Sequence, residues 1–216
     1  KRGDYAPYLY YTSDYGATWK TITKGIDSGH FTRVIRADRN TPGLLYAGTE
    51  FGLYMSSDAG QNWTSLQLNL PQVPITDLAL KDNDLIVSTQ GRSFWVLDDL
   101  DVLWQSLEAP VDPKALHLFQ PHPTVGFGGG NGKASDTRGT NHPAGVRTWF
   151  QLPDAYDTAT LTFKDATGDV IRSFATAESG DDAVEANPGL NHIEWDLRCE
   201  KADDSEGRLM CWGPLQ

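Results

Sequence analysis

Short runs of strand-forming residues, separated by turn residues, dominate the pattern of hydrophobic and polar positions along the chain. Apolar and polar residues alternate in residues 146–152 and 159–163, and compact apolar runs occur at residues 44–47 and 85–87. Gly, Asp, Asn or Pro residues bound these runs and favour turns. Alternation places one set of side chains on each face of a sheet. We therefore predict an all-β fold.

An eight-residue pattern occurs twice in the first half of the chain, with an offset of 44 positions. The first copy, T-S-D-Y-G-A-T-W, occupies residues 12–19, and the second, S-S-D-A-G-Q-N-W, occupies residues 56–63. We call them the first box and the second box. The alignment continues beyond the boxes, for instance from residues 31–34 to residues 75–78. A period of this size, holding about four short strands, is typical of a β-propeller blade.

Each residue type of the box has a structural task. The Asp carboxylate can accept hydrogen bonds from backbone N–H groups two or more residues further along the turn. The Gly adopts a positive φ without strain, and the Trp ring can be buried between neighbouring blades. The residues that we assign to this structural role are Asp14, Gly16, Trp19, Asp58, Gly60 and Trp63. The boxes are therefore interpreted as turn and packing devices rather than as ligand sites.

These boxes resemble the Asp-box, or BNR repeat, of sialidases, sortilin-type receptors and xyloglucanase-like glycoside hydrolases. Three wider segments, L-L-Y-A-G-T-E-F-G-L-Y (44–54), L-N-L-P (68–71) and G-R-S-F-W-V-L-D-D (91–99), resemble the final blades of large bacterial proteins catalogued as BNR-repeat or sortilin-like glycosyl hydrolases. In that family a Gly-rich link and an immunoglobulin-like segment containing G-L-N…W-D-L follow the propeller, and residues 189–197 match this run.

The pattern and the resemblance together divide the chain into three parts. Residues 1–120 are predicted to form the C-terminal blades of a larger propeller, with residues 98–123 serving as a connector. Residues 121–145 are a predicted Gly-rich linker. Residues 146–216 are predicted to form an immunoglobulin-like β-sandwich that is incomplete, because four strands are recognisable where a full sandwich has about seven.

The formal net charge of -11 and the absence of a basic patch argue against nucleic acid as a partner. No apolar run approaches the roughly 20 residues that a membrane span needs. The resemblance implies a secreted or periplasmic bacterial protein. Two blades and part of a third do not close a propeller, so we expect the remainder of the propeller, from the same or another chain, as a partner.

The two cysteines, Cys199 and Cys211, leave two alternatives open. They form a disulfide if the protein is exported, and otherwise they are free thiols. A zinc site is disfavoured because it needs four ligands and only His192 lies near in the sequence. We predict no metal and no cofactor.

Glu50 and Arg92 are the candidate ligand-channel residues, because they occupy equivalent points of successive blades, before the innermost strand. The alternative for these two residues is an inter-blade salt bridge or hydrogen bonds to loop backbone. Arg33 and Arg39 are expected to face solvent. No catalytic set is recognisable, although a glycosidase needs two facing carboxylates.

Two functions follow from these observations. The first is a non-catalytic structural or binding module with a glycan or protein ligand. The alternative is part of a carbohydrate-active glycoside hydrolase, sialidase- or xyloglucanase-like, whose catalytic carboxylates lie mostly outside this chain.

Overall fold

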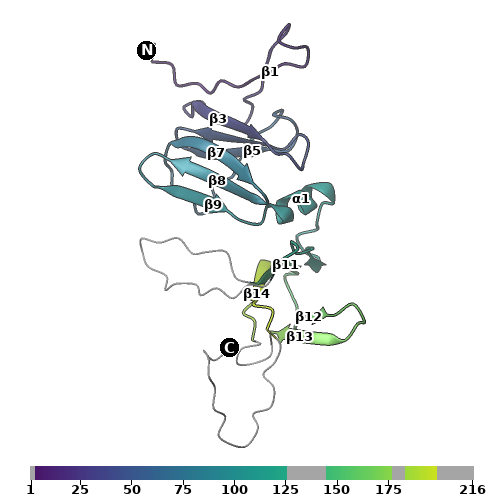
Figure 1. The fold of residues 1–216 in the computed structure, drawn as a ribbon. Helices are drawn as coiled ribbons and strands as arrows, with labels where there is room; N and C mark the ends of the chain where they lie inside the picture. Colours follow the sequence, from purple (N-terminus) through teal and green to yellow (C-terminus); the bar gives the residue numbers. More distant parts are fainter. Residues whose placement is uncertain (1–2, 126–144, 177–182, 199–216) are drawn as a thin grey trace, which may run out of the picture. The chain divides into compact units, whose positions relative to one another are not determined.

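The computed structural model describes residues 3–125, 145–176 and 183–198. Its contacts divide the chain into two units, Lys1–Val111 and Asp112–Gln216. Antiparallel strands dominate the described part of each unit, which confirms the predicted all-β class (Figure 1). Most of the predicted linker lies outside the described residues.

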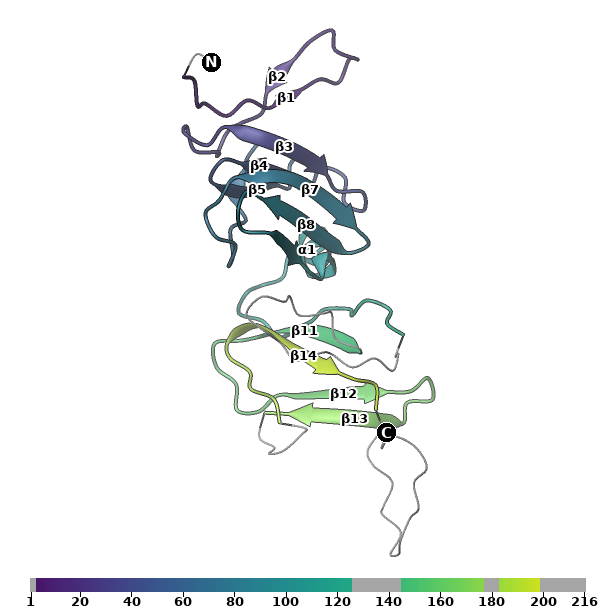
Figure 2. The same ribbon diagram turned by 60° about the vertical axis from the view of Figure 1, so that its left-hand side comes forward.

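The first unit contains three antiparallel sheets (Figures 1 and 2). Sheet 1 pairs β1 (Tyr10–Tyr11) with β2 (Lys20–Thr21). Sheet 2 has four strands in the order β3 (Thr32–Ala37), β4 (Leu45–Thr49), β5 (Gly52–Ser56) and β6 (Thr64–Ser65). Sheet 3 has the order β7 (Ile75–Lys81), β8 (Asp84–Thr89) and β9 (Phe94–Leu97).

The offset of the sequence repeat is also the offset of the strand pairing. Tyr10 pairs with Thr21 across β1 and β2, and Tyr54 pairs with Ser65 at the equivalent positions of β5 and β6. Sheet 1 therefore corresponds to the second half of sheet 2. Within the described residues, β1 pairs only with β2, whereas the equivalent strand β5 lies between two neighbours.

The central strands of sheet 2, β4 and β5, are buried on both faces, which explains the apolar run at residues 44–47. Tyr46 belongs to a core cluster that continues through β7 and β8 of sheet 3. Ala47 belongs to a second cluster together with Trp63 and Leu9, on the side of sheet 1. Adjacent residues of a strand point to opposite faces, so a strand that has protein on both sides is apolar at consecutive positions.

A helix, α1 (Leu100–Glu108), follows sheet 3 in the segment that we predicted to be a connector. Leu100 is buried in the first core cluster, and Leu103, Trp104 and Leu107 pack against that cluster. Their spacing of three or four residues places them on one face of a helix. The connector prediction was therefore wrong for these nine residues.

The described part of the second unit contains two sheets (Figure 2), and residues of both belong to one core. The first has the order β10 (His117–Leu118), β11 (Val146–Leu152) and β14 (Gly189–Trp195). The second is a hairpin of β12 (Thr160–Lys164) and β13 (Val170–Ala175). The shared core consists of Phe150, Leu152, Phe174, Ile193 and Trp195.

Candidate functional site

The first box is a turn closed by one carboxylate. Asp14 accepts hydrogen bonds from the Thr18 backbone N–H (2.8 Å), the Thr18 hydroxyl (2.7 Å) and the Thr12 hydroxyl (2.8 Å). The Thr12 hydroxyl in turn accepts the backbone N–H of Gly16 at 2.9 Å. These five side-chain and backbone groups thus satisfy one another without a ligand.

The second box repeats this network with different side chains. Asp58 accepts hydrogen bonds from the Asn62 backbone N–H (2.8 Å), the Asn62 amide (2.7 Å) and the Ser56 hydroxyl (2.8 Å). The Ser56 hydroxyl accepts the backbone N–H of Gly60 at 2.9 Å. The Asn62 amide therefore replaces the Thr18 hydroxyl as donor.

These hydrogen bonds keep both box carboxylates ionised. Donation from the side chain of Thr18 is the largest cause that lowers the pKa of Asp14 to about 2, and the side chain of Asn62 lowers the pKa of Asp58 to about 2. A hydrogen bond to the charged form stabilises that form. A carboxyl group with such a pKa does not serve as a general acid at neutral pH.

The two glycines of the boxes differ in their surroundings. Gly16 and Gly60 both have left-handed φ values, 91° and 86°. A Cβ atom at Gly60 would lie 2.6 Å from Cδ1 of Ile22, whereas at Gly16 the nearest atom would be 3.6 Å away, in the ring of Trp19. Gly60 is therefore required both by the backbone and by the close approach of Ile22.

The tryptophans of the boxes differ more strongly. Trp63 is 3% exposed and packs with Leu9 and Ile26, and its indole Nε1 donates to the carbonyl oxygen of Ile22 at 2.7 Å. Trp19 is 60% exposed, and its Nε1 donates within its own box, to the carbonyl oxygen of Gly16 at 3.1 Å. The second box thus joins two repeats, while the first box has its Trp in solvent.

Glu50 and Arg92 are not brought together by any contact among the described residues. Glu50 forms an ion pair with Arg33, whose Nε lies 2.6 Å and whose Nη2 lies 2.5 Å from the same carboxylate oxygen, Oε2. The side chain of Arg92 is exposed, and its carbonyl oxygen accepts the indole N–H of Trp95 at 3.0 Å. Arg33 and Arg39 are exposed, as expected, and Glu50 holds the Arg33 side chain at this surface.

A polar cluster that the sequence did not reveal joins the loop after β2 to strand β5. The hydroxyl of Tyr54 lies 2.8 Å from Nδ1 of His30 and 3.3 Å from Oδ2 of Asp27. Burial is the main cause that raises the pKa of Tyr54, so its hydroxyl stays protonated at neutral pH. Because a buried hydroxyl needs a partner, we interpret this cluster as satisfying Tyr54 at the contact between the first two sheets.

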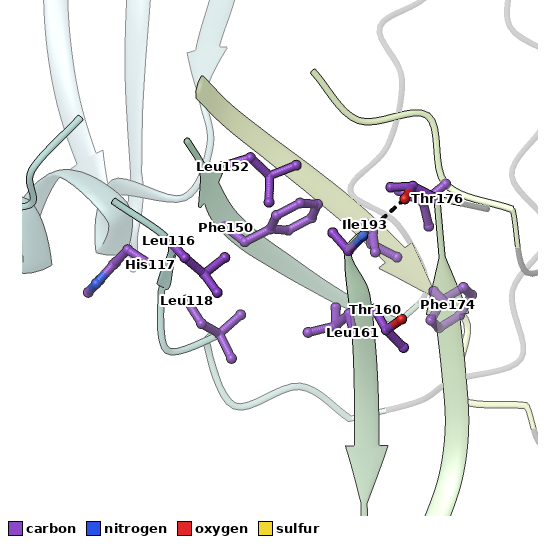
Figure 3. Close-up of a pocket in the computed structure, with 12 residues that line it drawn as sticks. Leu116, His117, Leu118, Phe150, Leu152, Thr160, Leu161, Phe174, Thr176 and Ile193 are labelled. Atoms are coloured by element: carbon purple, nitrogen blue, oxygen red, sulfur yellow. Dashed lines mark hydrogen bonds between the residues drawn. The ribbon is translucent and has the colours of Figure 1, made fainter. Parts of the chain in front are cut away.

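The second unit contains an apolar cavity of about 160 Å³ between its two sheets. Figure 3 shows Phe150, Leu152 and Ile193 from one sheet and Leu161 and Phe174 from the other around this space. His117 is the one titratable side chain in its described lining. The cavity can accept an apolar group, but its lining does not supply a pair of catalytic carboxylates.

No group of three or more His, Cys, Asp or Glu residues within the described ranges is arranged to hold a metal ion. Cys199 and Cys211 lie outside the described residues. In the parts of the chain that the structure describes, no helix has the length and apolar character needed to cross a membrane. Comparisons with family models, with curated proteins and with solved structures found no match. Function is therefore inferred from the residues and contacts of the chain itself.

Proposed function

We propose that the chain is a non-catalytic structural and binding module. Its first unit represents the C-terminal blades of a BNR-repeat β-propeller, and its second unit represents an immunoglobulin-like β-sandwich segment. The observation that carries this proposal is the contrast between the two tryptophans. One box closes an interface between repeats through Trp63, and an equivalent box displays Trp19 on an open face.

A second pair of equivalent residues supports this reading. Tyr54 is 6% exposed and faces sheet 1, whereas Tyr10, which precedes it by one repeat, is 54% exposed. Covering one large aromatic side chain contributes about 2 kcal/mol. The face that carries Tyr10 and Trp19 is therefore suited to a further repeat of the same kind, which is the expected remainder of the propeller.

The edge of sheet 1 supports the same partner. Strand β5 pairs with β4 as well as with β6, while its equivalent β1 pairs with β2 alone among the described residues. An unpaired edge offers backbone groups to a further strand. A further repeat would supply both a strand for this edge and an apolar face for Trp19, in the same chain or in another.

The non-catalytic part of the proposal is supported by the state of the carboxylates. The box carboxylates are ionised turn acceptors, and Glu50 is held by Arg33. The hydrolase alternative, which rests on the resemblance, therefore gains no support from the box carboxylates or from Glu50. The resemblance also implies a secreted or periplasmic location and a glycan or protein ligand, and we propose both for this module.

The repeat partner can be tested by duplicating one period of the chain. A copy of residues 8–51, 44 residues long, is inserted before Tyr8, so that the original β1 follows a copy of β4 as β5 does. We expect acrylamide quenching of the original Trp19, the one that follows the inserted copy, to fall several-fold. Its signal is the difference between the duplicated protein and a variant in which only this Trp19 is replaced by Phe. The matched control carries a scrambled copy of the same 44 residues.

Unchanged quenching of Trp19 in the duplicated protein would contradict the repeat partner. Catalysis is tested separately, by screening the chain for hydrolysis of polysaccharides and comparing it with Glu50→Gln. Turnover that disappears in a folded Glu50→Gln variant would overturn the non-catalytic assignment.

A further inference from the structure

An open groove of about 710 Å³ lies in the first unit, between helix α1 and two turns of sheet 2. One wall is formed by Asn40 and Thr41, in the turn between β3 and β4, and by Ser57 of the second box. The other wall is formed by the α1 side chains of Trp104, Gln105 and Glu108, among others. We propose that this α1 groove binds a neutral oligosaccharide.

One buried carboxylate holds both walls of the groove. Asp38 is 8% exposed, and its Oδ1 accepts the backbone N–H groups of Asn40 (2.8 Å) and Thr41 (3.0 Å). Its Oδ2 accepts the indole N–H of Trp104 at 2.9 Å and the hydroxyl of Tyr46 at 3.1 Å. A buried carboxylate with partners on both oxygens fixes the positions of those partners.

Two further contacts hold the turns and the helix that form the walls of the groove. The backbone N–H of Ala59 donates to the carbonyl oxygen of Gly43 at 2.8 Å, which attaches the second box to the neighbouring turn. At the start of α1, Oδ2 of Asp101 accepts the side-chain amide of Asn83 at 2.7 Å. The groove is therefore formed before a ligand arrives, which lowers the entropy lost on binding.

The chemistry of the walls matches a ligand rich in neutral hydroxyl groups. Asn40 and Gln105 bring amides, which both donate and accept hydrogen bonds, and Thr41 and Ser57 bring hydroxyls with the same ability. The indole of Trp104 adds an aromatic surface for the apolar face of a sugar ring. A few polar groups around an aromatic surface, in a volume of several hundred Å³, are typical of small-molecule sites.

The charge of the groove excludes acidic ligands. Asp101 and Glu108 are among its lining residues, and no Lys, Arg or His belongs to the lining that the structure describes. A phosphate or an acidic sugar would lie beside these two carboxylates, and repulsion between like charges costs free energy. A neutral sugar avoids this repulsion, and its hydroxyls can donate to the carboxylates.

An organic cation is the strongest competing ligand, because carboxylates and an indole also attract ammonium groups. Recognition of quaternary ammonium uses a cage of several aromatic rings, whereas Trp104 is the one aromatic residue in the described lining. The N–H donors of Asn40 and Gln105 would also face a ligand without acceptors. The neutral oligosaccharide fits both observations better.

This inference rests on the binding part of the proposed function and is independent of the repeat partner. The groove residues are not those of the Tyr10 and Trp19 face, so each test can fail while the other succeeds.

The test is a calorimetric titration of the full chain with neutral tetrasaccharides: cellotetraose, xylotetraose and maltotetraose. Tetragalacturonate and choline serve as the acidic and cationic probes. We expect saturable binding of at least one neutral tetrasaccharide and none of the other two probes. Gln105→Ala, which removes an amide from a half-buried helix position, should weaken binding about five- to tenfold.

Asn40→Ala provides a second variant on the opposite wall, with a similar expected loss. Gln72→Ala is the matched control, because Gln72 is an exposed glutamine outside the groove. Circular dichroism confirms that each variant is folded. The proposal is overturned if no neutral tetrasaccharide binds, if choline or tetragalacturonate binds more tightly, or if both groove variants bind as tightly as Gln72→Ala.

Discussion

The two boxes have the same internal hydrogen bonds and opposite relations to their surroundings. Asp14 and Asp58 accept equivalent sets of donors, so the turn depends on the local residues alone. Trp63 is buried because Ile22 and Leu9 lie next to it, while Trp19 is exposed. The comparison separates what a motif does by itself from what it does through a neighbouring repeat.

Truncation of the tryptophans should give the largest difference between the boxes. Trp63→Ala removes a ring that is 3% exposed, and we expect a loss of about 3–5 kcal/mol in the free energy of unfolding. Trp19→Ala removes an exposed ring and should cost about 0.5 kcal/mol. Urea unfolding of the two variants measures both values. Equal losses would contradict the different roles of Trp63 and Trp19.

Replacement of the glycines should give a smaller difference in unfolding free energy between the boxes, again with the larger loss in the second box. Gly60→Ala combines a left-handed φ of 86° with a contact of 2.6 Å to Ile22, and we expect it to cost about 3 kcal/mol. Gly16→Ala has the backbone strain without the clash and should cost about 1 kcal/mol. As a control, both glycine variants are made in an Ile22→Ala background. Their losses in the free energy of unfolding should then become more similar.

The titration of Asp14 and Asp58 should not differ between the two boxes. This equality tests whether the turn depends on local residues alone. The folded pKa of both Asp14 and Asp58 is about 2, below the ordinary value of 3.8. The folded protein thus binds fewer protons than the unfolded chain, and each group's contribution is complete above about pH 4 and is lost as the pH falls towards 2. Thermal unfolding between pH 5 and pH 2 should show the same reduction in acid sensitivity for Asp14→Asn and Asp58→Asn. Unequal reductions would indicate that the neighbouring repeat also acts on the carboxylate.

The features of the fold that follow from local pattern were predictable. The boxes, the hairpin of β12 and β13 and the all-β class all depend on residues a few positions apart. Helix α1 could also have been predicted, because Leu100, Leu103, Trp104 and Leu107 follow a helical spacing. We instead predicted a connector over residues 98–123, and the apolar spacing was overlooked.

The contacts of the candidate residues were not predictable from the sequence. Glu50 could pair with several cations, and its pairing with Arg33 depends on the register of β3 against β4. The buried Asp38 reads as an ordinary turn residue, yet it also binds Trp104, 66 positions away. Register and long-range packing decide such contacts, and a single sequence does not encode them in a short pattern.

The sequence by itself determined the turns, the repeat offset of 44 residues and the strand class, because backbone preference and alternation act over a few residues. The tertiary structure alone decided which tryptophan is buried, which cation holds Glu50 and where α1 and the β3–β4 turn leave a groove. Burial depends on what lies next to a side chain in space, and two boxes of the same pattern therefore end in opposite environments.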